Sequence, residues 1–154
     1  MQTGHSGRMN ADALFATFTY ARTLKLLPRG GWVMKGIPNP ESLADHSYGV
    51  AMMTLLLGDT LRREGIVVPD MERALRLALV HDLAESIITD IPAPMIRFFG
   101  ADAKAKAELQ AFREVVAGWP DAAALESLWR EFEERSTVEG RLVRAADKFD
   151  MMMQ

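Results

Sequence analysis

Two histidines and two aspartates stand out in this sequence because they fall on segments whose other residues are mostly apolar. His46 shares a helical face with Val50, the adjacent pair His81-Asp82 lies in an apolar run, and Asp147 lies on a third apolar stripe. A buried imidazole or carboxylate is costly unless it is hydrogen-bonded, paired or bound to a metal. Together the four residues form a mixed nitrogen and oxygen donor set that suits Mn, Fe, Co, Ni or Zn. They therefore predict a metal site.

The residues alone also allow an interpretation without a metal. His46 could be a core histidine bonded to a backbone carbonyl or paired with Asp147, and Asp82 could be capped. Glu85 and Asp90, which follow the pair, could be a solvent-facing carboxylate and a turn residue. We favour the metal because four costly residues on three apolar faces are harder to explain separately than one.

These residues need elements that bring them together, and the spacing of apolar residues predicts helices with no convincing strand. We expect an all-α fold that forms a compact orthogonal bundle rather than an extended solenoid. A long loop is expected over 28–40, where glycine and proline are frequent, and an interruption at Pro92 and Pro94. The expected helices cover residues 11–26, 42–63, 70–88, 101–117, 122–134 and 137 onward.

Two helix starts carry a capping-box pattern, in which a serine is followed three residues later by an acidic residue. These are Ser42 with Asp45 and Ser136 with Glu139. Both pairs are expected to hold the first turn of the helix that follows them.

Composition limits the class of protein. The chain has 154 residues, 49% hydrophobic and 25% charged, which predicts one globular domain. A net charge of -3 without a basic block argues against polymeric nucleic acid as a partner, and the longest apolar run, 50–58, is too short for a membrane span. The absence of cysteine excludes disulfides and thiolate ligands. We expect a cytoplasmic enzyme or binding domain.

The two ends of the chain give separate expectations. Residues 1–10 are expected to be a disordered leader, because they lack an apolar signal region, and residues 11–154 form the domain. The chain stops at Gln154 within a helical pattern that has no stop signal. The pattern therefore predicts that the C-terminal helix is truncated.

The four residues match a family signature. His46, His81-Asp82 and Asp147 form the H…HD…D pattern, within the segments GGWVMKGIPNPESLADHS, LALVHDLAESIITDIP and LWREFEERSTVEGRLVRAADKFDMMMQ. Over about residues 24–154 the sequence resembles the HD-domain metal-dependent phosphohydrolases, in their 5'-deoxynucleotidase-like branch. The resemblance implies the HD-domain form of the all-α bundle.

That resemblance also implies roles for individual residues. His46, His81, Asp82 and Asp147 would ligate one divalent ion, which could be Mn, Co, Fe, Ni, Zn or Mg, while Glu85 and Asp90 would handle protons during catalysis. The implied reaction removes phosphate from nucleoside 5'-monophosphates, deoxyribonucleotides above all, by metal-activated water. Relatives are dimers, so a homodimer is expected.

Residues for the substrate are implied less directly. Trp32 would pack against the sugar, although an aromatic residue in such a loop can also anchor the loop to the core. Bacterial nucleotidases of this family carry an Arg-Trp pair here that rejects a 2'-hydroxyl, whereas this chain has Gly31 before Trp32, as in the HD domain-containing protein 2 branch. Arg29, Lys35 and Arg97 are candidates for phosphate contact, against the alternative of solvated surface cations.

Two other readings of function stay open. The chain could be an HD hydrolase of nucleoside triphosphates or alarmones, although it lacks the additional basic motifs expected for a polyphosphate. It could also be a non-catalytic helical domain that binds a metal or nucleotide. Asp150 could compete as a metal ligand or be a solvated helix residue, and Lys104 with Glu108 is expected to form an exposed helical pair.

Overall fold

The computed structural model describes residues 11–153 and shows an all-α protein, as the sequence predicts. Apart from one antiparallel bridge between Pro28 and Ser42, these residues form no strand. The expected leader at residues 1–10 lies outside the described residues. The helices are α1 (Ala11–Thr23), α2 (Gly30–Met34), α3 (Leu43–Arg63), α4 (Met71–Val80), α5 (Glu85–Ile88), α6 (Ala93–Phe99), α7 (Ala101–Val115), α8 (Ala122–Glu134) and α9 (Val138–Met153).

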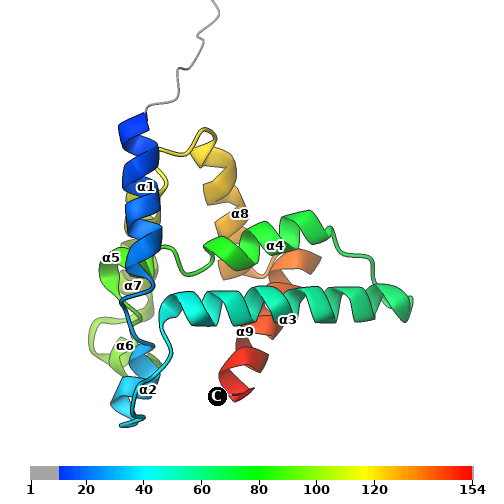
Figure 1. Cartoon of the computed structure of the whole chain (residues 1–154), viewed down its shortest axis with the longest axis horizontal. Helices are drawn as coiled ribbons and strands as arrows, with labels where there is room; N and C mark the ends of the chain where they lie inside the picture. The colour runs from blue at the N-terminus through cyan, green and yellow to red at the C-terminus, as the bar shows by residue number, and fades with distance from the viewer. Residues whose placement is uncertain (1–10, 154) are drawn as a thin grey trace, which may run out of the picture.

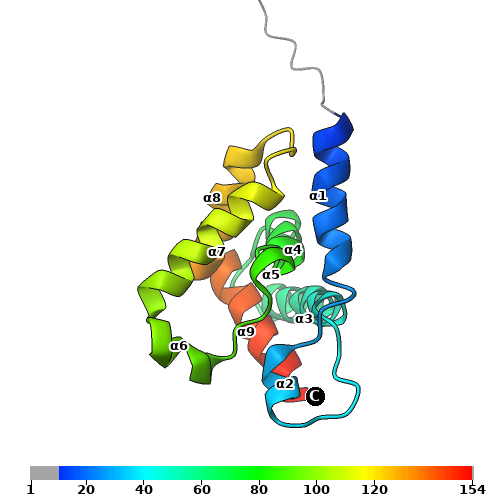
Figure 2. The same ribbon diagram turned by 90° about the vertical axis from the view of Figure 1, so that its left-hand side faces the viewer.

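Helix α3 is the longest of the described helices, and α4 runs along it at a shallow angle (Figure 1). Helix α9 crosses behind α3, α4 packs against both, and α1 stands nearly perpendicular to α3. In the view along α3, helices α7 and α8 lie on one side of α9 and α1 lies on the other (Figure 2). Among residues 11–153, no helix has both the length and the apolar character needed to cross a membrane.

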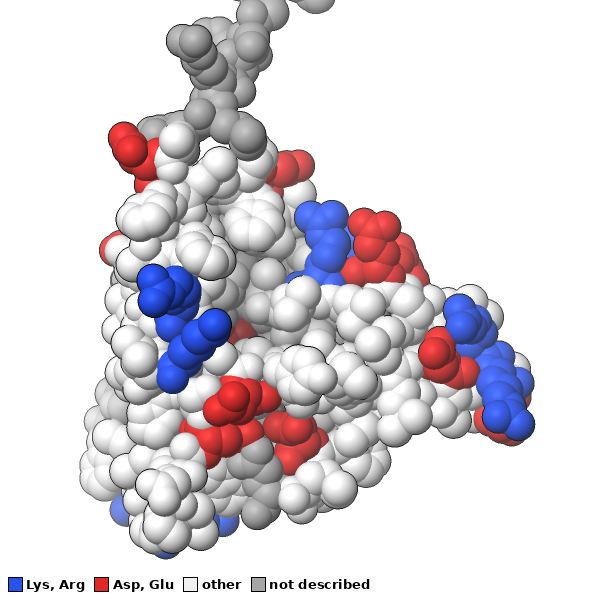
Figure 3. All heavy atoms as spheres, viewed as in Figure 1, with Lys and Arg blue, Asp and Glu red and all other residues white. Residues whose placement is uncertain are grey.

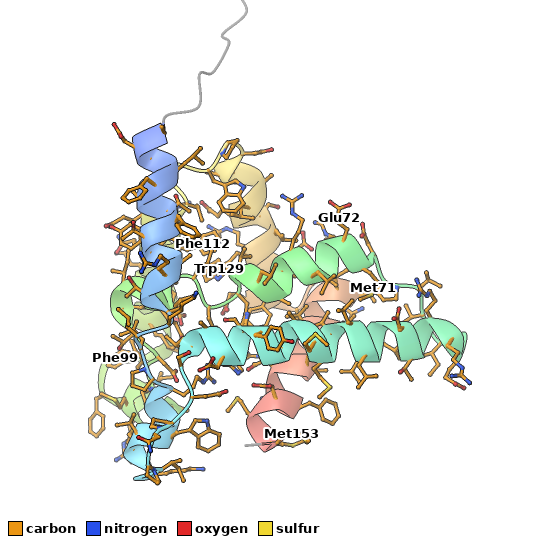
Figure 4. The ribbon with its side chains drawn as sticks, viewed as in Figure 1. Met71, Glu72, Phe99, Phe112, Trp129 and Met153 are labelled. Atoms are coloured by element: carbon orange, nitrogen blue, oxygen red, sulfur yellow. The ribbon has the colours of Figure 1, made fainter. Side chains whose placement is uncertain are left out.

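The core lies where α3, α4, α8 and α9 meet, and α7 closes it. Phe112 of α7 and Trp129 of α8 stack with ring centroids 4.9 Å apart (Figure 4). Met71 of α4 packs on Gly58 of α3, where an added Cβ would lie 2.3 Å from the Met71 sulfur. Side chains in such a close-packed interior have few alternative positions. The site residues are therefore carried by a well-packed scaffold.

The two expected capping boxes have different outcomes. At α3 the prediction is confirmed, because Ser42 Oγ accepts from Asp45 N and Asp45 Oδ2 accepts from Ser42 N, at 3.1 and 3.0 Å. At α9 the predicted Ser136 cap is wrong. Thr137 Oγ1 accepts from Gly140 N at 3.0 Å, while Glu139 Oε1 accepts from the backbone N–H of Asp70 at 2.8 Å. Helix α9 thus begins one residue later, and Glu139 ties it to the start of α4.

Two segments that were expected to be irregular contain short helices, α2 and α6. The glycine-rich part of 28–40 contains α2, and the proline interruption is the start of α6, with Pro92 as its N-cap and Pro94 in its first turn. Proline is compatible with the first turn of a helix because those N–H groups have no intrahelical acceptor. Helix α1 ends at Thr23 rather than at 26, where the chain turns toward α2.

The helix expected over 70–88 is broken at His81 and Asp82. Helix α4 ends at Val80, residues 81–84 form a tighter turn, and α5 begins at Glu85. Within this turn the backbone bonds span three residues, from Leu83 N to Val80 O and from Glu85 N to Asp82 O. A mid-helix stretch in which three-residue bonds replace the α-helical pattern often marks a functional position. A periodic apolar pattern does not reveal the break, because the turn keeps helical dihedral angles at its ends.

Candidate metal centre

The structure brings the four predicted ligands together from three elements. His46 comes from α3, His81 and Asp82 from the turn after α4, and Asp147 from α9. His46 Nε2 lies 3.3 Å from Asp147 Oδ1 and 3.6 Å from Asp82 Oδ2. His81 Nε2 lies 3.2 Å from Asp82 Oδ2. The four side chains therefore converge on one small volume at the centre of the bundle.

The donor atoms fit a divalent transition metal. His46 and His81 are 0% and 3% exposed, and each has a buried Nε2 that makes no hydrogen bond to the described residues. Ligand atoms of His46, His81 and Asp147 lie within 4.8 Å of one another. A buried imidazole nitrogen without a partner is costly, and an ion bound by two nitrogens and two carboxylates would remove that cost. The two unbonded imidazole nitrogens and the two carboxylates therefore fit a divalent metal ion.

The ring of His81 is held by the core around it. Its Nδ1 lies 2.8 Å from the Ala78 carbonyl oxygen, so the Nδ1 proton is donated there and Nε2 keeps its lone pair for the centre. Trp129 Nε1 donates to the His81 carbonyl oxygen at 3.0 Å, and the Phe132 ring contacts the imidazole edge-on. Helix α8 therefore fixes the backbone and the ring of a residue that it does not carry.

Both aspartates at the centre are held in their ionised form. Burial alone would raise the pKa of Asp82, but His81, His46 and Arg29 more than offset it, and the pKa lies well below the usual range. Burial likewise opposes ionisation of Asp147, whereas His46 and His81 draw its pKa down. Two carboxylates that stay charged in a buried place suit a cation.

Figure 3 shows where charge gathers on one face of the molecule. Acidic side chains cluster close to the beginning of α3, the helix that carries His46. A cluster of one sign of charge attracts ions of the opposite sign to that part of the surface.

Glu85 has the environment of an acid–base group. Its Oε2 is buried and makes no hydrogen bond to the described residues, which excludes the solvent-facing alternative. Burial, followed by the negative charges of Asp82 and Asp90, raises the pKa of Glu85 well above its usual value. A raised pKa makes the carboxylate form of Glu85 a stronger base than that of an exposed glutamate, which suits a role in proton transfer.

Arg29 and Asp90 form an ion pair beside the centre. Arg29 is 8% exposed, and its guanidinium lies 3.2 Å from Asp82 Oδ2 and 3.6 Å from Asp90 Oδ2, so the solvated-cation alternative is wrong for this residue. Asp90 also accepts a hydrogen bond from the Gly30 backbone at 2.9 Å. An added Cβ on Gly30 would lie 2.5 Å from the Asp90 carbonyl oxygen. The close approach of α2 to residue 90 therefore requires glycine.

Thr89, immediately before Asp90, has an unusual backbone. Its φ of 64° and ψ of 168° lie in a region that is almost exclusive to glycine. Thr89 N still donates to Glu85 O at 2.9 Å, which closes α5. Strain of this kind clusters at functional sites, and here it turns the chain so that the Asp90 carboxylate faces Arg29 and Gly30.

A cleft of about 410 Å³ lies next to Arg29 and Asp90. Its lining is largely apolar and includes Trp32 of α2, Pro92 just before α6, Pro94 in the first turn of α6 and Met151 of α9. Its charged members are Arg29, Lys35 and Asp90. Lys35 Nζ lies 5.0 Å from the centroid of the Trp32 ring. Arg97 stands apart from the cleft, because it is exposed on α6 with its guanidinium over the Phe98 ring.

Sequence reasoning missed two features around the centre. Asp150, weighed as a competing ligand or a solvated residue, lies 2.7 Å from His46 Nδ1 and contacts the imidazole on the side away from the centre. Lys104 and Glu108 do form an ion pair, but Glu108 is only 9% exposed, so the expected exposed pair is wrong. Lys104 also acts electrostatically on Glu85. No spacing rule could reveal the contact of Asp150 with His46 or the proximity of Lys104 to Glu85, because each depends on how distant helices pack.

Comparison with known proteins gives one family. The chain matches the HD domain family over residues 21–154. It is 38% identical over 133 residues to the 5'-deoxynucleotidase HDDC2 of Danio rerio, which covers 85% of this chain and 62% of that protein. It is 33% identical to the protein of the same name from Homo sapiens, over 99% of this chain and 69% of that protein. The chain thus spans about two thirds of the length of these relatives.

Solved structures agree with the fold. A crystal structure of a protein from Pyrococcus horikoshii OT3 aligns with a TM-score of 0.80 and 47% identity, over 91% of this chain and 75% of that one. A protein from Pyrococcus furiosus aligns with a TM-score of 0.80 and 41% identity, over 91% of this chain and 76% of that one. The bundle and the positions of its helices are therefore those of known structures.

Proposed function

Because this chain belongs to the HD-domain family, we propose that it is a metal-dependent phosphohydrolase that removes phosphate from nucleoside 5'-monophosphates. The observation that carries the proposal is the pair of buried, unbonded Nε2 atoms of His46 and His81, which face two ionised aspartates. The 5'-deoxynucleotidase names of the curated relatives support the substrate class.

We assign the divalent ion to His46, His81, Asp82 and Asp147. When bound there, such an ion polarises a phosphoryl oxygen and lowers the pKa of a water molecule. The net reaction forms a bond from the water oxygen to phosphorus and breaks the bond from phosphorus to the 5' oxygen. Inorganic phosphate and the nucleoside alcohol are the products.

The remaining residues then have separate tasks. We assign to Glu85 the uptake of the proton of the attacking water, because its Oε2 is buried without a hydrogen-bond partner among the described residues and its raised pKa makes its carboxylate a stronger base. Asp90 is our second candidate for proton transfer, and it also holds Arg29 and the start of α2. Arg29, whose guanidinium lies 3.2 Å from Asp82 Oδ2 and which also lines the cleft, is our first candidate for phosphate contact.

The cleft supplies a place for the nucleoside. Its apolar lining with a few polar groups is typical of small-molecule sites, and its volume suits a mononucleotide. We assign the sugar and base to the wall formed by Trp32 and Pro92, with Lys35 at the edge. Arg97 stays only a sequence-based candidate, which would need movement of α6 to reach the phosphate.

The substrate class can be tested by phosphate release from protein reconstituted with Mn²⁺ or Co²⁺. We expect release from dAMP, dGMP, TMP or AMP, and little from a nucleoside triphosphate. Release from triphosphates or alarmones alone would support the alternative hydrolase. That alternative has less support here, because the cations of the cleft among the described residues are Arg29 and Lys35. Metal binding without any hydrolysis would instead support a binding domain.

Selectivity for the sugar gives a second prediction. Gly31 lies on α2 at the cleft, and an added Cβ would meet nothing within 4 Å, so a larger side chain fits there. Replacing Gly31→Arg restores the Arg-Trp pair that the resemblance associates with rejection of a 2'-hydroxyl. We expect the ratio of kcat/KM for dAMP over AMP to rise about tenfold, which is the effect of one well-placed contact.

The control for this change is Gly31→Ala, which adds volume without a guanidinium and should leave the ratio close to that of the parent. An unchanged ratio in the arginine variant, with kcat preserved, would show that this position does not set sugar selectivity.

A homodimer and a cytoplasmic location stay predictions from the sequence and the resemblance. The first is checked by light scattering of the purified protein across a range of concentrations. The second is checked by fractionation of the cells that make it.

A further inference from the structure

We propose that Asp150 is a positioning residue, which accepts a hydrogen bond from His46 Nδ1–H and so presents the Nε2 lone pair of His46 to the metal centre. The inference rests on the proposed metal site but concerns an aspartate outside the ligand set. Asp150 Oδ2 lies 2.7 Å from His46 Nδ1, the two residues are 104 positions apart, and the imidazole is fully buried.

The two histidines of the centre are oriented by different means. His81 Nδ1 faces the carbonyl oxygen of Ala78, which belongs to the backbone of the same helical segment. His46 Nδ1 faces side chains instead: Asp150 at 2.7 Å and Glu41 at 3.9 Å. A neutral imidazole carries one proton, and the nitrogen that makes the better hydrogen bond keeps it. The Asp150 carboxylate therefore selects the tautomer in which Nε2 is free to bind an ion.

Gly49 provides independent support, because it makes room for the carboxylate. It lies on α3 one turn after His46, and an added Cβ would lie 2.0 Å from Asp150 Oδ1. Glycine in the middle of a helix lowers its stability, so a glycine at this position needs a local reason. The close approach of the Asp150 side chain of α9 to the backbone of α3 is that reason.

A second metal site on this side is the competing interpretation. One ligand atom each of Glu41, His46 and Asp150 lies within 4.8 Å of the others, so the group could in principle hold an ion. An ion at Nδ1 together with one at Nε2 would require His46 to lose both of its ring protons. In metal sites of proteins, the histidine ligand commonly donates a hydrogen bond from its other ring N–H to a carboxylate. This hydrogen bond raises the basicity of the nitrogen that binds the metal.

The test replaces Asp150→Asn, which keeps the shape and removes the charge, and measures the ring nitrogens of His46 by ¹⁵N NMR in metal-free protein at a pH high enough for both imidazoles to be neutral. We expect wild-type His46 to carry its proton on Nδ1, and the variant to shift His46 toward the Nε2–H tautomer. His81 is the internal reference and should not change, because the Ala78 carbonyl remains. Gly49→Ala should shift His46 in the same direction while the carboxylate is still present.

A second readout is the affinity for Mn²⁺, measured by competition with a chelator. Loss of such a positioning contact typically costs 10–100-fold in metal affinity, and we expect a loss in that range for Asp150→Asn. The matched control is Asp59→Asn on α3, which removes the same charge at an exposed position paired with Arg62 and should leave both readouts unchanged. Thermal unfolding without metal checks that each variant is folded.

The results of these measurements distinguish failure of the Asp150 proposal from failure of the proposed function. An unchanged His46 tautomer in folded Asp150→Asn protein overturns the proposal, and so does binding of two ions by wild type with one lost in the variant. If the tautomer and the affinity change as expected but no monophosphate is hydrolysed by wild type, the proposed function fails and the positioning role of Asp150 stands.

Discussion

Replacing His81→Ala is expected to abolish both stoichiometric binding of a divalent metal and release of phosphate from nucleoside monophosphates. The substitution removes one of the two nitrogen donors, and the remaining carboxylates are poorer ligands for a transition metal. We expect activity to fall by about 10³-fold or more, because both charge stabilisation and formation of the nucleophile depend on the ion. Metal content per chain, measured by elemental analysis, and a phosphate-release assay check this.

The same substitution tests the site against a general loss of structure. His81 packs against Phe132, so the alanine variant is also expected to be less stable, and activity must be compared below its unfolding temperature. The matched control is His5→Ala, which removes a histidine outside the described residues and should leave metal content and activity unchanged. Activity within tenfold of wild type in His81→Ala would show that the centre is not where the reaction occurs.

Replacing Glu85→Gln is expected to separate chemistry from metal binding. The amide cannot accept the proton of the attacking water, so we expect kcat to fall by about 10²–10⁴-fold. Metal content should stay close to wild type because Glu85 is not among the four assigned ligands. Steady-state kinetics with dAMP, together with metal analysis of the same preparation, measure both. Loss of the metal together with kcat would mean that Glu85 is a ligand rather than an acid–base group.

Glu85→Gln should also make the metal-free protein more stable at neutral pH. The folded state raises the pKa of Glu85 above the ordinary 4.5, mainly through burial, so the folded protein favours the protonated form. As pH rises above about 4.5, the unfolded chain releases this proton first, and the free energy of unfolding falls until the folded pKa is passed. Glutamine does not ionise, so the variant does not undergo this fall in the free energy of unfolding. We expect a higher Tm at pH 7 and no difference below about pH 4, by calorimetry with a chelator present.

Much of the fold could be predicted because its signals are local. The apolar spacing of α3, α7 and α8 and the Ser42 capping box depend on residues within a few positions of one another. Glycine and proline hide α2 and α6 in the sequence, because they usually interrupt helices although both are compatible with a first turn. The break after Val80 has no local signal, because residues 81–84 keep the apolar pattern of a helix.

Part of the candidate site could likewise be predicted from local sequence signals, and part could not. His46, His81 and Asp147 could be predicted because a polar residue on an apolar face is visible in the sequence. The contact of Asp150 with His46 could not, because it depends on how α9 crosses α3 and on the space left by Gly49. The family resemblance supplied roles for Glu85 and Asp90, but only the structure shows that Glu85 is buried and that Asp90 is held by Gly30.

The origin of the four ligands in three distant segments has a consequence for how the chain holds together. The sequence contains no cysteine, so no disulfide can join its early and late parts. An ion bound by both His46 and Asp147 would close a loop of about 100 residues, and a covalent cross-link of that span is worth about 4.7 kcal/mol by chain-entropy arguments. The same ion that serves the reaction would thus also act as an internal cross-link between the early and late parts of this cysteine-free chain.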